Sequence, residues 1–231
     1  ISDDCSPDKT EKVVQYYIDN HPKGNWIKYT KHAINKGMNP NFVWALNQCK
    51  GNYIALCEGD DYWVDPLKLQ KQVDFLENNP GFTICFHKVK VLQDKNFSTD
   101  ENIENRFPLN MDGVASLDDL LLNGNFINTT SVVFKNNLII NDLPNELLYS
   151  PVGDYILHVI NAKKGLIKRF DDKMAVYRKG VGIYSTLDSL SFTRNMIKYQ
   201  AILLPLLDNS NQREIIIKKL FNNIENYERS V

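Results

Sequence analysis

The chain of 231 residues lacks several features that mark whole classes of protein. It has no apolar run approaching the roughly 18 residues that a membrane-spanning helix needs. Its first residues do not have the pattern of a signal peptide. A formal net charge of −1 gives no electrostatic reason to expect a nucleic-acid partner. The hydrophobic fraction of 43% and the charged fraction of 24% are those of an ordinary globular protein.

Cysteine is also scarce. The four cysteines, Cys5, Cys49, Cys57 and Cys85, are scattered and lack the close spacing of zinc ligands. Three of them, Cys49, Cys57 and Cys85, lie in apolar helix or strand patterns, where buried free thiols are common. We therefore expect reduced cysteines and a cytoplasmic location.

The most informative stretch is an acidic turn that follows a short apolar run. Residues 53–57 are bounded by glycines and predict a buried strand. Three carboxylates follow at the end of that strand: Glu58, Asp60 and Asp61. Ligands of open α/β sheets bind beyond the carboxyl ends of the strands, and clustered oxygen ligands suit Mg²⁺ or Mn²⁺. The alternative is an acidic turn that merely ends a core strand.

The first 91 residues alternate between helical and strand patterns, starting from a helix signal at Ser6-Pro7-Asp8. The expected elements are a helix to about Asn20, a strand over 26–29, a helix over 41–48, a strand over 53–57, a helix over 67–78 with Leu69, Val73 and Leu76 inward, and a strand over 82–91. This order predicts an α/β fold with a mainly parallel, Rossmann-like open sheet flanked by helices.

The second half is less regular. It predicts a mobile loop over 93–112, a helix over 116–122, a strand over 130–134, a helix from Ser150-Pro151 to 162, strands over 166–170 and 174–178, and helical structure from about 190 onward. Ile216, Leu220 and Ile224 form an apolar stripe that we expect to pack on the core. We therefore expect one domain with a C-terminal helical tail.

Four separated segments together resemble glycosyltransferase family 2. They are Ile1-Ser2-Asp3-Asp4-Cys5-Ser6, Asn35-Lys36-Gly37 with Asn41, Cys57-Glu58-Gly59-Asp60-Asp61-Tyr62-Trp63, and Gly153-Asp154-Tyr155. The resemblance implies a GT-A domain over residues 1–186 and a C-terminal helical extension over 187–231. It also implies a missing N-terminal strand and helix, because the family normally opens with one more of each.

The resemblance assigns the donor side of the site. Asp3 or Asp4 would bind the base or ribose of the donor, although both could simply cap the helix that follows. Asn35 and Lys36 would also contact the donor. Asp60 would be the direct ligand of Mn²⁺ or Mg²⁺, and Glu58 and Asp61 would contact ribose or surround the metal. Arg178 or Lys179 would offset phosphate charge.

The acceptor side follows from the remaining motifs. Asp154, at the start of a predicted helix, matches the family's catalytic base; by itself it could be an ordinary first-turn carboxylate. Trp63 could form an apolar platform for a sugar ring, although a large aromatic there is as often core. The polar run 128–131 would supply hydroxyl and amide groups near the acceptor. In the segment from Met174 to Ser185, Gly180 stands where the family has a histidine.

The implied function is inverting transfer of a sugar from a nucleotide diphosphate sugar to a glycan or lipid-linked acceptor, with a UDP-sugar as the expected donor. The implied setting is bacterial surface polysaccharide synthesis, in the cytoplasm, with scope for peripheral association with the inner membrane. Two alternatives remain open. One is a non-catalytic nucleotide- or sugar-binding module of the same fold. The other is a nucleotidyltransferase, which would need a glycine-rich phosphate loop that this sequence does not contain.

Overall fold

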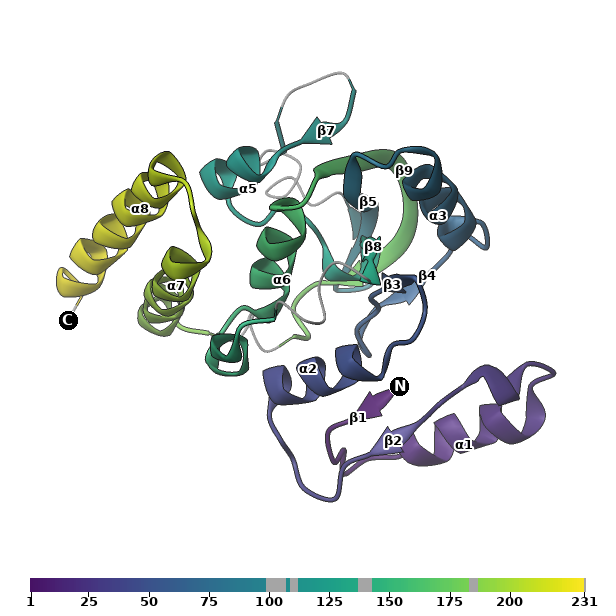
Figure 1. Cartoon of the computed structure of the whole chain (residues 1–231). Coiled ribbons are helices and arrows are strands. Elements are labelled where there is room, and N and C mark those ends of the chain that lie inside the picture. The colour runs from purple at the N-terminus through teal and green to yellow at the C-terminus, as the bar shows by residue number, and fades with distance from the viewer. Residues whose placement is uncertain (99–106, 109–111, 137–142, 183–186, 231) are drawn as a thin grey trace.

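The computed structural model describes residues 1–98, 107–108, 112–136, 143–182 and 187–230 (Figure 1). Its α-helices are α1 Thr10–Asn20, α2 Met38–Gln48, α3 Lys68–Asn78, α5 Leu117–Asn123, α6 Gly153–Ala162, α7 Ser189–Leu203 and α8 Ser210–Glu228. Its strands are β1 Ser2–Asp3, β2 Thr30–Lys31, β3 Tyr53–Ala55, β4 Tyr62–Trp63, β5 Phe82–Gln93, β6 Asn96–Ser98, β7 Val114–Ala115, β8 Val133–Lys135 and β9 Leu166–Arg178. Short 3₁₀ turns are η1 Gly24–Trp26, η2 Thr129–Ser131, η5 Asn145–Tyr149 and η7 Leu204–Leu206.

The main sheet has the strand order β3-β8-β5-β9-β4, with β6 paired to β5 and β7 paired to β9. β5 and β9 are parallel, and the other neighbours in this sheet are antiparallel. β1 and β2 form a separate parallel pair. The α/β class with flanking helices is confirmed. Among the described strands, however, the pairing is mixed rather than mainly parallel, because short strands such as β4, β7 and β8 return antiparallel to their neighbours.

Most expected elements are present, and the differences have local causes. The first helix begins at Thr10 rather than after Ser6, and the Asp8 carboxylate accepts the Thr10 N–H at this later start. The strand expected over 26–29 is replaced by η1, and β2 follows it. The two strands expected over 166–178 are one continuous strand, β9. Most of the loop expected over 93–112 lies outside the described residues.

Helix α3 buries Leu76 as predicted, with Val73 packed against the same cluster, but Leu69 is 42% exposed rather than inward. Lys68 and Gln72 are buried in its place. The helix is therefore rotated so that two polar side chains enter the protein beside Leu76. Their hydrogen-bond partners compensate for the loss of water.

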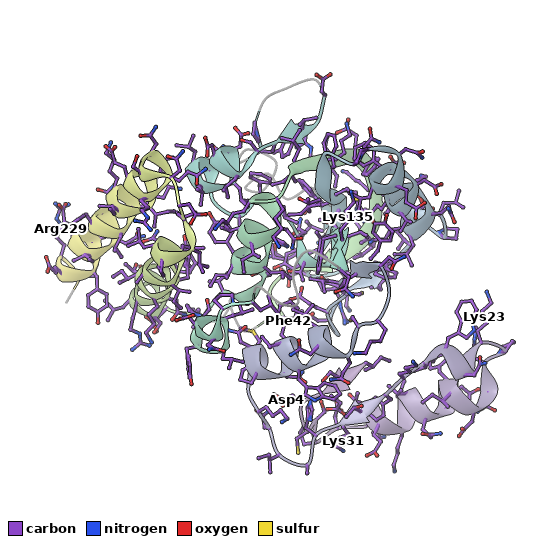
Figure 2. All side chains as sticks on the ribbon, in the orientation of Figure 1. Asp4, Lys23, Lys31, Phe42, Lys135 and Arg229 are labelled. Atoms are coloured by element: carbon purple, nitrogen blue, oxygen red, sulfur yellow. The ribbon has the colours of Figure 1, made fainter. Side chains whose placement is uncertain are left out.

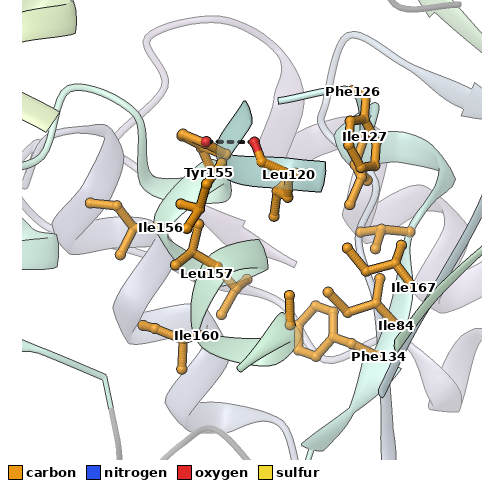
Figure 3. Close-up of a cluster of buried hydrophobic side chains, with 14 of the residues drawn as sticks. Ile84, Leu120, Phe126, Ile127, Phe134, Tyr155, Ile156, Leu157, Ile160 and Ile167 are labelled. Carbon is orange, nitrogen blue, oxygen red and sulfur yellow. Dashed lines mark hydrogen bonds between the residues drawn. The ribbon is translucent and has the colours of Figure 1, made fainter. Parts of the chain in front are cut away.

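The core lies between the sheet and helix α6. Every residue of α6 is buried except Asp154, as expected for a helix that is apolar on all sides. Figure 3 shows Ile156, Leu157 and Ile160 of this helix near Ile84, Phe134 and Ile167 of the sheet. The Tyr155 hydroxyl donates to the Leu120 carbonyl at 2.9 Å, which joins α6 to α5 (Figure 3).

The C-terminal helices extend the same core. Tyr199, Leu203, Leu207 and Ile216 belong to the buried cluster that contains α6. Ile216 is buried, and Leu220 and Ile224 are half-buried, so the predicted apolar stripe does face the protein. Figure 1 places α7 and α8 on the side of α6 away from the sheet. Within the described residues, no helix is both long and apolar enough to cross a membrane.

Candidate functional site

The acidic turn between β3 and β4 forms a compact group of carboxylates. Glu58, Asp60 and Asp61 each offer one oxygen, and these oxygens lie within 4.8 Å of one another. Glu58 is exposed, Asp60 is half-buried and Asp61 is buried. The predicted clustering of the three side chains is therefore confirmed.

Arg178, at the end of β9, fixes the shape of this turn. Its backbone N–H donates to Asp61 Oδ1 at 2.9 Å. Its guanidinium donates to the carbonyl oxygens of Asp60 and Gly59. β4 pairs with β9 directly after the turn, with Tyr62 opposite Val176. The Arg178 side chain thus contacts the backbone of the acidic turn, and its predicted contact with a donor phosphate stays a prediction.

Glycines let the following segment come close to the turn. A Cβ added at Gly182 would lie 3.6 Å from Asp60 Oδ2, so the backbone passes beside this carboxylate. Gly180, which stands in the family's histidine position, has φ +92°, a conformation that other L-residues rarely adopt.

The electrostatics of the turn favour a bound cation. Desolvation, together with the nearby charges of Asp154, Asp61 and Asp60, raises the pKa of Glu58 to about 8. Burial, opposed by the Arg178 N–H, raises the pKa of Asp61 to about 6. Asp61 Oδ2 is buried and has no hydrogen-bond partner among the described residues. Clustered carboxylate oxygens, one of them buried without a donor, fit a hard divalent cation.

Asp154 is the one residue of α6 that is not buried, and it reaches the same site. Its Oδ2 accepts hydrogen bonds from Asn125 Nδ2 at 3.1 Å and from the Thr129 hydroxyl at 3.2 Å. The η2 turn joins the two segments: Thr129 donates a hydrogen bond to Asp154, and Thr130 Oγ1 lies 3.7 Å from the Sγ of Cys57, the residue before Glu58. The fold thus brings the acidic turn and the start of α6 together, and the charge of Asp154 contributes to the raised pKa of Glu58. Sequence reasoning assigned no separate role to Asn125 or Thr129; the polar run 128–131 was the only signal near them.

Gly153 allows this helix start to approach α2. A Cβ at Gly153 would lie 2.6 Å from Asn39 Oδ1, and the Asn39 amide donates to the Ser150 carbonyl. The side chain of Asn39 is thus tied in place and cannot easily move aside. Close packing against α2 therefore sets where Asp154 stands.

The other predicted donor residues lie in the N-terminal part of the chain. Asp3 is buried and accepts hydrogen bonds from the Tyr29 hydroxyl at 2.5 Å and from the Ser6 N–H at 2.7 Å. Burial alone would raise the pKa of Asp3, but these hydrogen bonds lower it below its usual value. Asp3 therefore holds the local fold, and its contact with a donor stays a prediction.

Asp4 orders the loop that precedes α2. Its two oxygens accept hydrogen bonds from the N–H groups of Lys36 and Gly37 at 2.7 and 2.9 Å. The structure thus brings Asp4, Asn35 and Lys36 together, and Figure 2 shows Asp4 near Lys31 on the side of α2 away from the main sheet. Among the residues that the structure describes, their hydrogen bonds stay within this part of the chain and do not join it to the acidic turn.

Trp63 is half-buried, and its indole is held by the protein. Its Nε1–H donates to the Thr130 carbonyl at 2.9 Å, and Lys68 Nζ lies 4.4 Å from the centre of the ring. Burial lowers the pKa of Lys68 to about 8. A pocket of about 380 Å³ is lined by Trp63, Val64, Asp65, Pro66, Lys68 and Leu69. The ring thus has a clear packing role, and contact with an acceptor stays a prediction.

With this geometry in hand, comparison with known proteins decides the family. The family model described as Glycosyl transferase family 2 matches residues 1–132. This chain belongs to Glycosyl transferase family 2. An uncharacterized protein of Mycobacterium tuberculosis is 39% identical over 180 residues, which cover 78% of this chain and 49% of that protein. The family member described here thus spans about half the length of the curated relatives it matches.

Two solved structures confirm the GT-A fold of this family member. One is Staphylococcus aureus TarS, residues 1–349, in complex with UDP-GlcNAc, with a TM-score of 0.68 and 18% identity over 96% of this chain and 61% of TarS. The other is the mannosyltransferase PcManGT of Pyrobaculum calidifontis in complex with GDP-Man and Mn²⁺. Its TM-score is 0.64, at 13% identity over 95% of this chain and 58% of PcManGT. At these identities the likeness establishes the fold alone.

Proposed function

We propose that this chain carries the catalytic domain of an inverting glycosyltransferase that uses a nucleotide diphosphate sugar, with a UDP-sugar as the first candidate donor. The proposal rests on two groups of carboxylates that lie together in one site. The acidic turn supplies Glu58, Asp60 and Asp61, and the start of α6 supplies Asp154. The nucleotide sugars bound to TarS and PcManGT support this class of donor.

The acidic turn is the proposed metal site. Asp60 would bind Mn²⁺ or Mg²⁺ directly, with Asp61 and Glu58 beside it, because the three offer converging oxygens and Asp61 Oδ2 has no donor among the described residues. The bound cation would stabilise the negative charge of the nucleotide diphosphate that leaves. Arg178 would keep the turn in its binding shape through the carbonyls of Gly59 and Asp60.

Asp154 is the proposed general base. The acceptor oxygen forms a bond to the anomeric carbon as the bond from that carbon to the diphosphate oxygen breaks. The hydroxyl proton of the acceptor moves to the Asp154 carboxylate. Attack from the face opposite the leaving group inverts the anomeric centre. The half-exposed position of Asp154 at the end of a buried helix suits this role, because the protein holds the side chain while an acceptor can reach it.

The acceptor would be a hydroxyl of a glycan or lipid-linked carrier in bacterial surface polysaccharide synthesis, at the cytoplasmic face of the membrane. These assignments rest on the resemblance to the family, and the contacts in the site do not select among acceptors.

The test is a donor panel of UDP-, GDP- and dTDP-sugars, assayed for hydrolysis or transfer with Mn²⁺ and with EDTA. We expect turnover of at least one donor with Mn²⁺ and its loss with EDTA. Binding of a nucleotide sugar in calorimetry, without turnover under any condition, would support the non-catalytic binding module instead.

The variant Asp154→Asn separates binding from chemistry. Asn is nearly isosteric with Asp but cannot accept the proton of the acceptor, so we expect donor affinity close to that of the parent and transfer slower by about 10²–10⁴-fold. Calorimetry with the donor and a transfer assay measure the two effects. Transfer within a few-fold of the parent would show that another residue is the base.

A further inference from the structure

Thr129 contacts both halves of the proposed site. Its hydroxyl donates to Asp154 Oδ2 at 3.2 Å, and its side chain lies close enough to Glu58 to act on the pKa of that carboxyl. Glu58 belongs to the acidic turn and Asp154 to helix α6. A single hydroxyl on the η2 turn thus lies between the proposed metal site and the proposed base.

Asn125 approaches Asp154 with its amide in one defined orientation. Asn125 Oδ1 accepts the backbone N–H of Ile127 at 3.2 Å, and it also faces His158 Nδ1 at 3.3 Å. A backbone N–H can only donate, so the oxygen of the amide must face Ile127. The NH₂ group therefore faces Asp154 Oδ2, at 3.1 Å.

His158 supports this orientation from inside the core. It is fully buried, and burial lowers its pKa to about 4, so the ring is neutral at pH 7. A neutral imidazole has a single N–H, and a hydrogen at Nδ1 donates to Asn125 Oδ1. The other ring nitrogen, Nε2, is buried without a hydrogen-bond partner in the described part of the chain, as fits the nitrogen that carries no hydrogen.

The η2 turn that carries Thr129 is itself anchored in the core. Trp63 Nε1 donates to the Thr130 carbonyl and Gln72 Nε2 donates to the Ser131 carbonyl, each at 2.9 Å. Thr130 and Ser131 are completely buried. Since side chains from β4 and α3 hold this backbone through hydrogen bonds, Thr129 has little freedom to move away from Asp154.

We propose that Thr129 and Asn125 are positioning residues that hold the Asp154 carboxylate in its working orientation, and that they assign the proton-accepting role to Asp154 Oδ1. This inference rests on the proposed function of Asp154 as a base. A carboxylate oxygen offers about two lone-pair positions. Asn125 and Thr129 occupy both positions of Oδ2, whereas Oδ1 accepts only the Tyr155 N–H, at 2.8 Å, among the described residues. One position of Oδ1 is left for the acceptor hydroxyl.

Matched variants test the positioning role by kinetics. Thr129→Val removes the hydroxyl at nearly constant shape, Thr129→Ser keeps it, and Asn125→Ala removes the amide. We expect Thr129→Val and Asn125→Ala to lower kcat by roughly 10- to 100-fold with little change in donor KM, because misplacing a catalytic group by about 1 Å has effects of this size. Thr129→Ser should recover most of the rate. The control is Thr83→Val, which removes a buried hydroxyl bonded to the Asn161 carbonyl in the core, away from Asp154.

Crystal structures of the parent and of the same variants supply a readout that does not depend on turnover. We expect the Asp154 carboxylate to rotate away from its parent position in Thr129→Val and Asn125→Ala, and to keep that position in Thr129→Ser. The inference would be overturned if the Asp154 carboxylate kept its parent position in both Thr129→Val and Asn125→Ala. Equal rates for Thr129→Val and the parent would also overturn it. A parent that turns over no donor would overturn the proposed function alone, since the crystal structures still decide whether these residues hold Asp154.

Discussion

At the scale of single residues, the three carboxyls of the acidic turn have different surroundings. Asp61 is tied to the Arg178 N–H, and Glu58 contacts Thr129. Asp60 has its carboxylate beside the backbone of Gly182, and its carbonyl is the group held by Arg178. Asp60 is thus the member whose carboxylate can be removed with least disturbance of the turn.

We therefore expect Asp60→Ala to abolish Mn²⁺-dependent donor binding while the fold survives. Without metal, the loss of one negative charge from a repelling cluster should leave the melting temperature unchanged or slightly raised. Thermal melting checks the fold, and calorimetry with a nucleotide sugar, with and without Mn²⁺, checks binding. A variant with undiminished Mn²⁺ dependence would show that Asp60 is not the ligand.

The raised pKa values also predict how stability depends on pH. Glu58, at about 8, and Asp61, at about 6, both lie above their ordinary values of 4.5 and 3.8. At these two groups the folded state therefore binds more protons than the unfolded state, and their contribution to stability falls as pH rises. The buried His87 and His158 oppose this effect below about pH 6.5, because burial lowers their pKa values from 6.5 to about 4. In EDTA we therefore expect the melting temperature to fall as pH rises from about 6.5 to 8, and Mn²⁺ to raise it more at pH 8 than at pH 5.

The variant Glu58→Gln is the control for this pH effect, because Gln cannot titrate. Its melting temperature in EDTA should fall less between pH 6 and pH 8 than that of the parent. An identical pH profile in the two proteins would mean that Glu58 does not carry the effect.

The sequence predicts these carboxylates well and their partners poorly. Glu58, Asp60 and Asp61 are close along the chain, so a local pattern is enough to group them. Asn125 and Thr129 lie 29 and 25 positions before Asp154 along the chain, and the packing of α6 against the sheet brings them to it. Asp3 illustrates the converse: its local pattern allows a donor contact, but its burial against Tyr29 depends on residues far along the chain.

At the scale of elements, the contact between α2 and the start of α6 is the tightest constraint on the base. We expect Gly153→Ala to destabilise the protein by roughly 1–3 kcal/mol, the usual cost of overpacking, because its Cβ would meet Asn39 Oδ1 at 2.6 Å. It should also slow transfer, since Asp154 is the next residue. Chemical denaturation and the transfer assay measure the two effects.

Gly81→Ala is the matched control. A Cβ at Gly81 meets nothing within 4 Å, and this glycine does not have a positive φ. Its stability should stay close to that of the parent. Equal stability of Gly153→Ala and Gly81→Ala would mean that α2 can shift enough to accommodate the added Cβ.

Element types were predicted more reliably than pairing. Helices α5 and α6 have local start signals in the sequence, Ser116 and Ser150-Pro151, and α5 does form the Ser116–Asp119 capping box. Strand partners are set by contacts between distant segments, so the antiparallel return of β8 between β3 and β5 has no local signal. The inward rotation of Lys68 and Gln72 on α3 was missed for a similar reason: their partners, Trp63 and the Ser131 carbonyl, lie on other elements.

At the scale of the whole molecule, the C-terminal helices share one core with helix α6 and the sheet. The predicted boundary between residues 186 and 187 stays a prediction, but Tyr155 of α6 packs edge-on against Tyr199 of α7 with ring centres 5.4 Å apart. Ile216 of α8 is 1% exposed within the same apolar cluster.

We therefore expect Ile216→Ala to lower the free energy of unfolding of the entire chain by about 2–5 kcal/mol. The control is Ile217→Ala on the same helix, because Ile217 is 39% exposed and should matter little. Chemical denaturation followed by both circular dichroism and tryptophan fluorescence measures the effect. Two separate transitions, with only one shifted by Ile216→Ala, would show instead that the extension unfolds independently.

The hydrogen bond from the Arg178 N–H to Asp61 joins residues 117 positions apart, and this has a consequence for how the protein folds. Closing so long a loop costs chain entropy, which must be recovered by contacts formed at the same time, here the long β5–β9 pairing. A chain with its helices formed but β9 still unpaired would lack the hydrogen bonds from Arg178 to the acidic turn. The cation-binding shape of the turn should therefore appear only when the sheet is complete. Mn²⁺ binding during refolding would then report completion of the tertiary structure rather than the growth of helices.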